Sequence, residues 1–268
     1  MSLPEILHYG FMQRALLAGA LVGALTAAVG TYVVLRGMAF LGAGISHAAF
    51  GGVALGYLLG LNPTAFALLF CILASWAIAA SQRIGKLKGD VPIGILFASS
   101  MAIGAIAIGL MKEYTIDLFS YLFGSILAVT FWDLIVALIL GTIVFSLVLI
   151  FYRQFLYIAF DPQMARVSGI PVVAMDMLLL GMISVTIVIS MKIVGIILVS
   201  SLLVAPAATA VPWVRSFKSL LGLSAAIGAG GSIGGVIISY YLNTPSGATI
   251  ALLLALGFFA SAILKRGE

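Results

Sequence analysis

The stretch FWDLIVALILGTIVFSLVLIFY, residues 131–152, holds a single charged side chain, Asp133, and is apolar on every face of a helix. At 1.5 Å per residue, a helix of this length crosses the roughly 30 Å of hydrocarbon in a bilayer. A membrane β-strand would instead alternate apolar and polar residues over about ten positions. The stretch therefore predicts a transmembrane α-helix.

Eight further apolar runs of spanning length accompany this one. They lie at about 11–35, 38–61, 64–82, 91–111, 172–191, 194–214, 219–241 and 247–264. The whole chain of 268 residues is 63% hydrophobic and only 8% charged, whereas soluble domains carry about 25% charged residues. Such a chain cannot cover its surface in water. We therefore predict an all-α polytopic membrane protein of about nine transmembrane helices, within a range of eight to ten, forming one transmembrane domain over residues 1–268.

The basic residues predict the orientation of these spans. Ten of the 13 fall at alternate junctions between the runs, namely Arg36, Arg83, Lys86, Lys88, Arg153, Arg166, Arg215, Lys218, Lys265 and Arg266. Cytoplasmic junctions are enriched in Lys and Arg, so we expect the N-terminus outside and the C-terminus inside. The other three, Arg14, Lys112 and Lys192, fall at or near the outer side. Because the basic residues are scattered singly, the net charge of +5 does not indicate a nucleic-acid partner.

One segment between two runs does not read as a span. Residues 114–130, YTIDLFSYLFGSILAVT, are moderately apolar but short and polar at their start. Irregular backbone at membrane depth is tolerated only where protein buries it or where it lines a cavity. We therefore predict a short re-entrant or surface helix in this segment.

The segment most informative about function is RGMAFLGAGISHAAFGGVALGYLLG, residues 36–60. His47 is the only histidine within a predicted span, and at 1.5 Å per residue it lies about 16 Å from the inner end of the segment, near mid-membrane. Its neighbours on the same helical face, Ala43, Gly44 and Gly51, carry little or no side chain. A polar ring at this depth is costly unless it faces protein or water, and neutral imidazole is the commonest transition-metal ligand. The residues alone leave open a metal-binding histidine and a structural histidine that bonds a carbonyl across a tight contact.

Five motifs carry a family resemblance, beginning with GAGISHAAFGGVALG at residues 42–56. The other four follow along the chain as Asp90-Val91-Pro92-Ile93-Gly94-Ile95, Tyr121-Leu122-Phe123-Gly124, Phe160-Asp161-Pro162 with Ala165 and Gly169, and Val204-Ala205-Pro206-Ala207-Ala208-Thr209-Ala210. In this order they resemble the motifs of the ABC-3 family, the permeases of bacterial zinc, manganese and iron ABC importers. The resemblance covers nearly the whole chain.

This resemblance implies a type II ABC importer permease that works as a homodimer in the cell membrane of a bacterium or archaeon. It implies two further partners, cytoplasmic ATP-binding-cassette ATPase subunits and an extracytoplasmic solute-binding protein. The divalent metal is then cargo, and no stably bound cofactor is expected. His47 falls on the family's metal-pathway histidine. Further candidates for lining or gating the path are Ala43, Gly44, Ser46, Gly51 and Pro206, of which the proline lacks a donor N–H and is expected to kink or break its helix, either inertly or as a hinge.

The chain departs from the family at one position of this path. Many members carry an aspartate four residues before the histidine, which puts a carboxylate and an imidazole on one helix face, whereas this chain has Ala43. A second ligand for His47 must then come from the partner subunit's His47, from water, from a carbonyl or from a thioether. The loss of a hard oxygen ligand favours zinc over manganese, because manganese prefers carboxylates and zinc suits imidazole.

The longest polar stretch, RQFLYIAFDPQMARVSGIP at residues 153–171, faces the predicted cytoplasm and reads as one short amphipathic helix. Asp161 fits an N-cap, Pro162 the first helical position and Gly169 the C-terminal end. The family resemblance places the coupling helix here, and a solvated linker is the alternative. The candidate contacts to the ATPase are Asp161, Pro162, Gln163, Ala165, Arg166 and Gly169. On the outer side, the charged cluster of Lys112, Glu113 and Asp117 is either a docking site for the binding protein or simply solvated.

Motifs that the sequence lacks limit the function further. It contains no G-x-x-x-x-G-K-[ST] phosphate loop, no HExxH motif and no recognisable Ser-His-Asp or paired-carboxylate set. We therefore expect a transport subunit that is not an enzyme, with ATP hydrolysed by a separate partner. Two alternatives remain: a type II importer permease for a metal chelate such as a siderophore or cobalamin, and an ATP-independent metal-ion channel or carrier. A permease for a chelate needs a wider path than a permease for a bare ion. An ATP-independent channel or carrier would have more ionisable residues within its spans.

Overall fold

The computed structural model describes residues 8–84, 90–111, 118–124 and 129–266, and all regular structure within these ranges is helical. The α-helices are α2 (Gly10–Leu35), α3 (Phe40–Leu58), α4 (Pro63–Ile84), α5 (Val91–Leu110), α6 (Leu118–Phe123), α7 (Phe131–Ile150), α8 (Tyr152–Phe160), α9 (Pro162–Val167), α10 (Val172–Ile193), α11 (Ile196–Ala210), α12 (Phe217–Leu242) and α13 (Ser246–Arg266). The 3-10 helix η2 (Val211–Trp213) continues α11.

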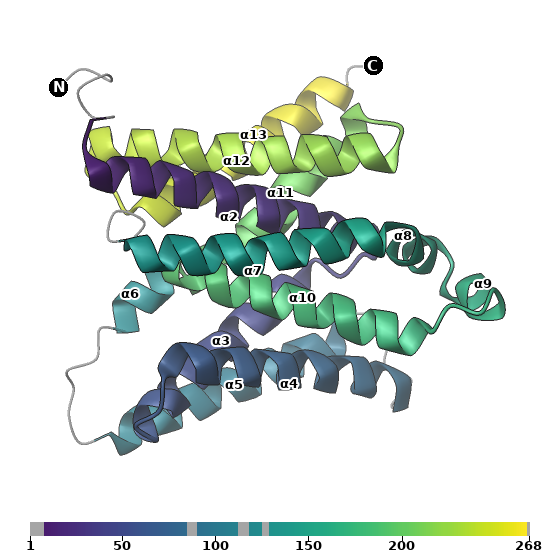
Figure 1. Ribbon diagram of the computed structural model, residues 1–268, viewed down its shortest axis with the longest axis horizontal. Helices are drawn as coiled ribbons and strands as arrows, with labels where there is room; N and C mark the ends of the chain where they lie inside the picture. Colours follow the sequence, from purple (N-terminus) through teal and green to yellow (C-terminus); the bar gives the residue numbers. More distant parts are fainter. Residues whose placement is uncertain (1–7, 85–89, 112–117, 125–128, 267–268) are drawn as a thin grey trace.

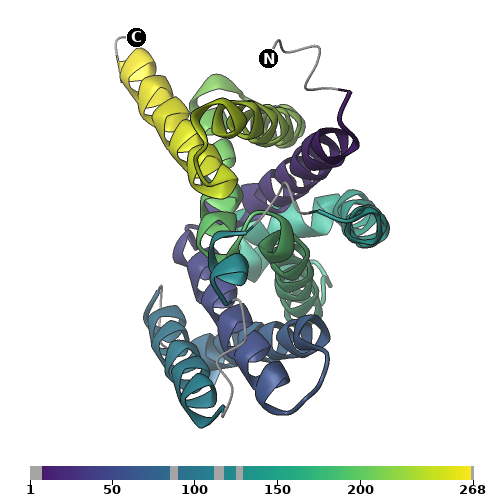
Figure 2. The ribbon, with the colours of Figure 1, turned by 90° about the vertical axis from the view of Figure 1, so that its left-hand side faces the viewer.

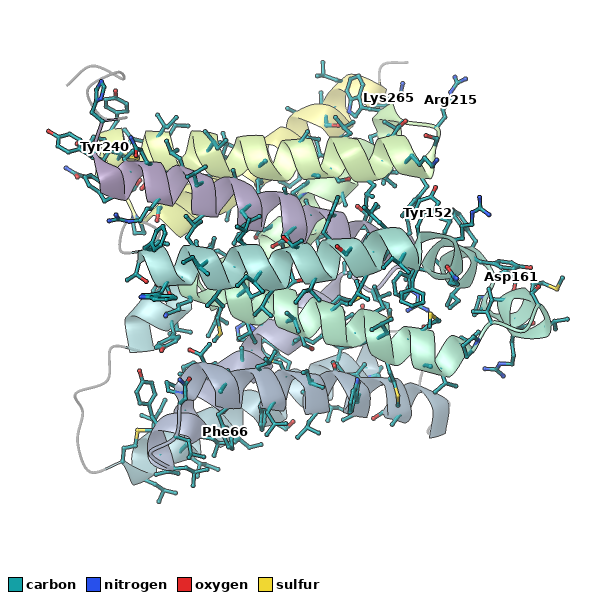
Figure 3. All side chains as sticks on the ribbon, viewed as in Figure 1. Phe66, Tyr152, Asp161, Arg215, Tyr240 and Lys265 are labelled. Carbon is teal, nitrogen blue, oxygen red and sulfur yellow. The ribbon has the colours of Figure 1, made fainter. Side chains whose placement is uncertain are left out.

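Nine helices of the described ranges are long and apolar enough to cross a membrane, namely α2, α3, α4, α5, α7, α10, α11 with η2, α12 and α13. The prediction of nine spans is confirmed, and their ends fall within a few residues of the predicted runs. In Figure 1 these helices run side by side, with α6 at one end of the bundle and α8 and α9 at the other. Because the number of spans is odd, α2 begins at the α6 end and α13 finishes at the α8–α9 end. Arg215 and Lys265 lie at the α8–α9 end (Figure 3), which is the end that the basic residues predict to be cytoplasmic.

Helix α2 lies at the centre of the bundle and packs against α7, α10, α11 and α12. Its closest neighbour is α12, because Gly23 and Gly228 face each other so tightly that a Cβ atom on either would overlap the carbonyl group of the other. A buried hydrogen bond of 3.1 Å between the hydroxyls of Thr26 and Ser190 joins α2 to α10. Small residues give such close backbone contact in a bilayer, where no hydrophobic effect drives helices together.

The break between α10 and α11 is the sharpest feature of the backbone. Gly195 has φ +100° and ψ 151°, a conformation that is essentially open to glycine alone. The end of α6 packs directly on this break, where a Cβ atom on Gly124 would overlap the backbone of Val194 and Gly195. The predicted short helix within residues 114–130 is thus present as the six residues of α6, which pack against α10 and α11 and are too few to span. Irregular backbone at this depth is satisfied because protein covers it.

Pro206, where the sequence predicts a kink or a break, does not end its helix. Helix α11 runs on from Ile196 to Ala210 with the buried Pro206 in its interior. The chain breaks instead one residue before α11 begins, at Gly195. A break at the proline therefore does not occur, because the proline is carried inside α11, and the kink stays a prediction.

The polar stretch at the cytoplasmic end forms two helices, namely α9, which was predicted, and α8 before it, which was not. Asp161 separates them with an extended backbone, φ −146° and ψ 90°. The physical reason is the following residue, Pro162, whose ring disfavours the helical conformation at the residue before it. The sequence contained this signal, and it places the start of α9 at Pro162 as predicted.

Replacing Gly195 with alanine is expected to destabilise the folded chain. The substitution adds roughly 1–3 kcal/mol of backbone strain, and the new Cβ atom would lie 2.5 Å from the backbone nitrogen of Gly124 and 2.7 Å from the carbonyl oxygen of Leu122. The measurement is the thermal unfolding midpoint in detergent. The matched control is Gly230→Ala on α12, where nothing lies within 4 Å of the added atom. Equal midpoints for the two variants would contradict the role given to this break.

Candidate metal site

His47 lies midway along α3, on the face between α5 and α11. Gly42 faces α11, where an added Cβ atom would lie 2.7 Å from Leu203 Cδ2, and Gly44 faces α5, where it would lie 2.6 Å from Ile93 Cγ2. At 100° per residue, the direction of His47 falls between these two contacts. Its ring is partly exposed, whereas the residues on either side of it, Ser46 and Ala48, are buried. Figure 2 shows α3 and α11 at the centre of the bundle, with α5 and α13 diverging to either side of them. The imidazole thus points to the side of α3 that lies between α5 and α11.

The orientation of the His47 ring is fixed by its own helix. Its Nδ1 atom lies 2.9 Å from the carbonyl oxygen of Ala43, one turn earlier. A carbonyl oxygen can only accept, so in the neutral ring Nδ1–H donates and the lone pair remains on Nε2. Histidines that bind metals in proteins usually donate their second ring N–H in this way. The ring also packs on Phe97 of α5, with 4.4 Å between ring centroids, which limits its rotation. The arrangement presents Nε2 as a metal ligand.

One chain does not supply a complete ligand set around this ring. Within the described ranges, no group of three or more His, Cys, Asp or Glu side chains converges on a point that could hold a metal ion. The carbonyl that the His47 ring meets belongs to its own helix and not to a neighbouring one. The described part of one chain thus supplies a single candidate ligand at this position.

The other residues predicted for the path occupy different positions around α3 and α11. Ala43 is partly exposed on the same face as His47. Gly44 and Gly51 lie instead in the contact with α5, where an added Cβ atom on Gly51 would lie 2.7 Å from the carbonyl oxygen of Ser100. Ser46 is fully buried, and its hydroxyl has no hydrogen-bond partner among the described residues. Ala43 and His47 thus lie together on one face of α3. Gly44 and Gly51 lie on another face, where they let α5 pack closely against α3.

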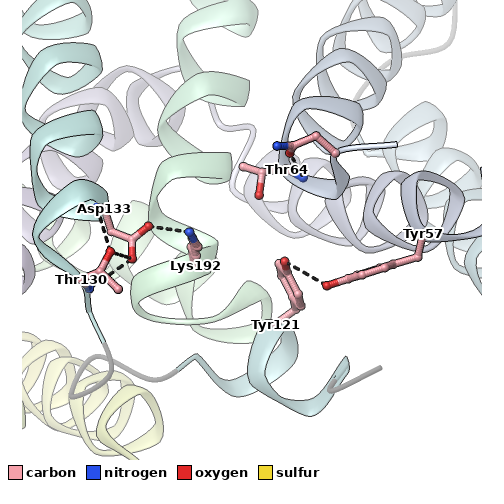
Figure 4. A network of polar contacts seen from close by, with 7 residues as sticks. Tyr57, Thr64, Tyr121, Thr130, Asp133 and Lys192 are labelled. Carbon is pink, nitrogen blue, oxygen red and sulfur yellow. Dashed lines mark hydrogen bonds and ion pairs between the residues drawn. The ribbon is translucent and has the colours of Figure 1, made fainter. Parts of the chain in front are cut away.

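Sequence reasoning missed several residues that meet only in three dimensions. Phe97 touches the His47 ring from another helix, and nothing in its local sequence sets it apart. At the outer end, Lys192 of α10 forms an ion pair with Asp133, which also forms a capping box with Thr130 at the start of α7. Figure 4 shows this pair together with Tyr57 and Tyr121, whose hydroxyls lie 3.5 Å apart. The predicted outer cluster of Lys112, Glu113 and Asp117 lies outside the described residues.

The cytoplasmic end presents the second candidate surface, α9 with the end of α8. The Asp161 carboxylate caps α9 by accepting hydrogen bonds from the backbone N–H groups of Gln163 and Met164, at 3.0 and 2.9 Å. Gly169, with φ +82°, follows the end of α9, and the Tyr157 and Ser168 hydroxyls lie 3.2 Å apart and tie α8 to it. The predicted cap and helix end are thus confirmed.

The exposure of these short helices sets them apart from the spans. Phe160, Met164 and Val167 are 72%, 51% and 80% exposed, although they lie beyond the apolar ends of the spanning helices. Of the six predicted contact residues, Ala165 is buried, while Pro162, Gln163, Arg166 and Gly169 are exposed. Figure 3 shows Asp161 at the tip of this projection. Exposed apolar side chains on a rigid element outside the membrane are typical of a surface that another protein covers.

Comparison with known proteins finds relatives over nearly the whole chain. Residues 8–265 match the family model described as the ABC 3 transport family. The manganese import system permease protein ScaB of Streptococcus gordonii is 40% identical over 253 residues, which cover 94% of this chain and 91% of that protein. The high-affinity zinc uptake system membrane protein ZnuB of Haemophilus influenzae is 34% identical over 94% of this chain and 96% of its own length. The solved structure of PsaBC from Streptococcus pneumoniae in complex with Fab has a TM-score of 0.86 at 38% identity, covering 96% of this chain and 93% of that one.

Replacing Ala43 with aspartate is expected to strengthen manganese binding. The two side chains are one turn apart on one face of α3, so the new carboxylate would stand beside the imidazole, and manganese favours carboxylate oxygen. A tenfold fall in the dissociation constant corresponds to about 1.4 kcal/mol, and we expect a change of this order in titrations of the purified transporter. Ala43→Asn is the matched control, since it adds a similar volume without charge. An aspartate variant that binds manganese no better than the asparagine variant would show that position 43 lies outside the metal site.

Proposed function

The chain belongs to the ABC 3 transport family, and we propose that it is the membrane-spanning permease subunit of an ATP-binding-cassette importer for divalent transition-metal ions. The family match over residues 8–265 and the relatives named for manganese import and zinc uptake support this function. The observation that carries it in the structure is the His47 ring, which lies midway along a membrane span with Nδ1 held by the Ala43 carbonyl and Nε2 left to bind. The nine apolar helices place the protein in the cell membrane.

We propose that two copies of the chain form the transport path and that the metal passes His47 of each. A single chain offers one imidazole and no further converging ligand in its described part, so a second copy related by two-fold symmetry supplies the second ring. In this proposal the two His47 rings meet across the partly exposed side of α3, between α5 and α11. The metal is cargo that a solute-binding protein delivers from outside, and a separate ATPase provides the energy. The permease itself needs no catalytic residue.

Two observations bear on the identity of the metal, and they point in different directions. Ala43 removes the carboxylate that manganese prefers, which favours zinc. The relative at 40% identity is named for manganese, and the relative at 34% is named for zinc. A bare pair of imidazoles with water accepts either ion, so we propose that both zinc and manganese are transported. Competition between the two ions in an uptake assay measures their order of preference.

We propose that α9 and the end of α8 form the contact with the ATPase. Helix α9 is capped at Asp161, ends at a left-handed glycine and carries its exposed apolar side chains outward. An element of this kind can move as a unit and transmit a displacement. Arg36 and Asp176 form an ion pair close by, and both line a cavity of about 300 Å³ together with Pro162. The pair connects the inner end of α2 to α10 beside the start of α9.

Replacing His47 with alanine is expected to abolish metal uptake at limiting metal concentration, because the substitution removes the only imidazole within the described spans. The measurement is uptake of labelled zinc and manganese by vesicles that contain the complete transporter. His8→Ala is the matched control, since His8 is the only other histidine of the chain and lies outside the spans. Uptake by the His47 variant that equals uptake by the control would rule out the proposed path.

Replacing Asp161 with alanine is expected to weaken the coupling between ATP hydrolysis and transport. Loss of an N-cap costs about 0.5–2 kcal/mol of helix stability, which is a large fraction of the stability of a six-residue helix. The readout is the ratio of metal transported to ATP hydrolysed in the reconstituted complex. Asp161→Asn retains a capping oxygen and should preserve the ratio. If both variants couple as well as the parent chain, α9 does not transmit the motion.

A further inference from the structure

A groove runs along the outside of the bundle between α4 and α7, with α10 as its floor. It consists of two adjoining cavities of about 340 and 300 Å³, which share Leu140 and Val185 in their linings. We call it the α4–α7 groove. Figure 2 shows α4 and α7 on the opposite side of the bundle from the pair α5 and α13. The groove is thus separate from the His47 face, and the proposed transport function does not use it.

The inner part of the groove has the shape and chemistry of an acyl-chain site. Apart from the indole of Trp76, its side chains are aliphatic or thioether groups, and at Gly181 the floor has no side chain at all. Trp76 closes this end by donating its Nε1–H to the carbonyl oxygen of Met177, at 3.3 Å. From Met177 to Lys192, α10 rises about 22 Å, which is more than the roughly 15 Å of hydrocarbon in one leaflet. The groove is therefore long enough for an extended lipid chain.

The outer part of the groove ends in polar groups. Lys192 is half exposed and gives one ammonium donor to Asp133, so that two further N–H donors remain. Asn62 uses its side-chain oxygen to accept from the backbone N–H groups of Thr64 and Ala65, both at 3.1 Å. Its amide NH₂ group is left as a donor. Asn62, Thr64, Asp133 and Lys192 all line the same cavity, and Figure 4 shows Thr64 and Lys192 on facing helices.

We propose that the α4–α7 groove binds a glycerophospholipid of the outer leaflet. Its phosphodiester lies against Lys192 and Asn62, and one acyl chain lies between α4 and α7 down to Trp76. Charge complementarity supports this occupant, because the cationic donor stands at the mouth of an otherwise apolar groove, as a phosphate above a hydrocarbon chain requires. The neighbouring Asp133 accepts from hydroxyl or ammonium groups of the lipid head. The bilayer supplies this ligand at high concentration, so even modest affinity fills the site.

A substitution at Gly181 tests the proposal. Nothing lies within 4 Å of an added Cβ atom at this position, so Gly181→Leu fills the groove, and leucine also favours the helix over glycine. The matched control is Gly257→Leu on α13, which has the same free space and lies away from the groove. Both variants are purified with the complete transporter in mild detergent, and the phospholipid that remains bound is measured by native mass spectrometry and by lipid extraction.

The parent complex and Gly257→Leu are expected to retain a phospholipid that Gly181→Leu loses, and Lys192→Gln is expected to reduce its retention. Equal retention by Gly181→Leu and the parent chain would overturn the proposal. So would dissociation of the two copies in the Gly181 variant, because the groove would then be an interface between chains. Full retention by Lys192→Gln would remove the phosphodiester contact from the proposal and overturn it in the form stated.

Discussion

The bilayer offers the backbone no hydrogen-bond partner, and the rest of this structure follows from that constraint. Every described segment at membrane depth closes its own N–H and C=O groups in a helix or is covered by protein. The tight connection at Gly195, between α10 and α11, illustrates the rule, since α6 packs on it and buries it. A chain built in this way has little freedom in its secondary structure. What distinguishes one such fold from another is how its helices pack against one another.

The helices approach one another most closely where glycine, which has no side chain, lies in the contact. Gly23 and Gly228 let α2 and α12 touch through their backbones, Gly51 does the same for α3 and α5, and Gly44 makes room for the Ile93 side chain. Apolar side chains gain little from contact with each other when lipid is the alternative, so packing depends on van der Waals contact at short range. The consequence for function is that α3 is held tightly on the α5 side, while His47 keeps a partly exposed position. A rigid support for one polar ring is what a passing ion requires.

The two ends of the bundle are built differently, and the difference corresponds to the two tasks of a transporter. At the outer end the polar groups pair within the chain, as in the ion pair of Asp133 with Lys192. At the inner end α8 and α9 extend beyond the spans and expose Phe160 and Val167. Exposed apolar side chains outside lipid gain free energy when another protein covers them. The inner end therefore presents an apolar surface that a partner protein can cover.

The sequence by itself determined the features that depend on nearby residues. Hydropathy predicted nine spans, the basic residues predicted their orientation, and Asp161 with Pro162 predicted the start of α9. The position of His47 near the middle of a spanning helix also followed from its place along one apolar run. These succeed because membrane insertion and helix capping depend on contiguous stretches of chain.

Tertiary structure alone decided the features in which residues distant in sequence meet. Phe97 lies against His47, α6 packs on Gly195, and α4, α7 and α10 enclose a groove. The predicted path residues Gly44 and Gly51 proved to lie in a helix contact, because the hydropathy of an apolar helix does not tell which face meets which neighbour. Rotation and register of apolar helices are set by the fit of distant surfaces, and that information is present only once the helices have packed.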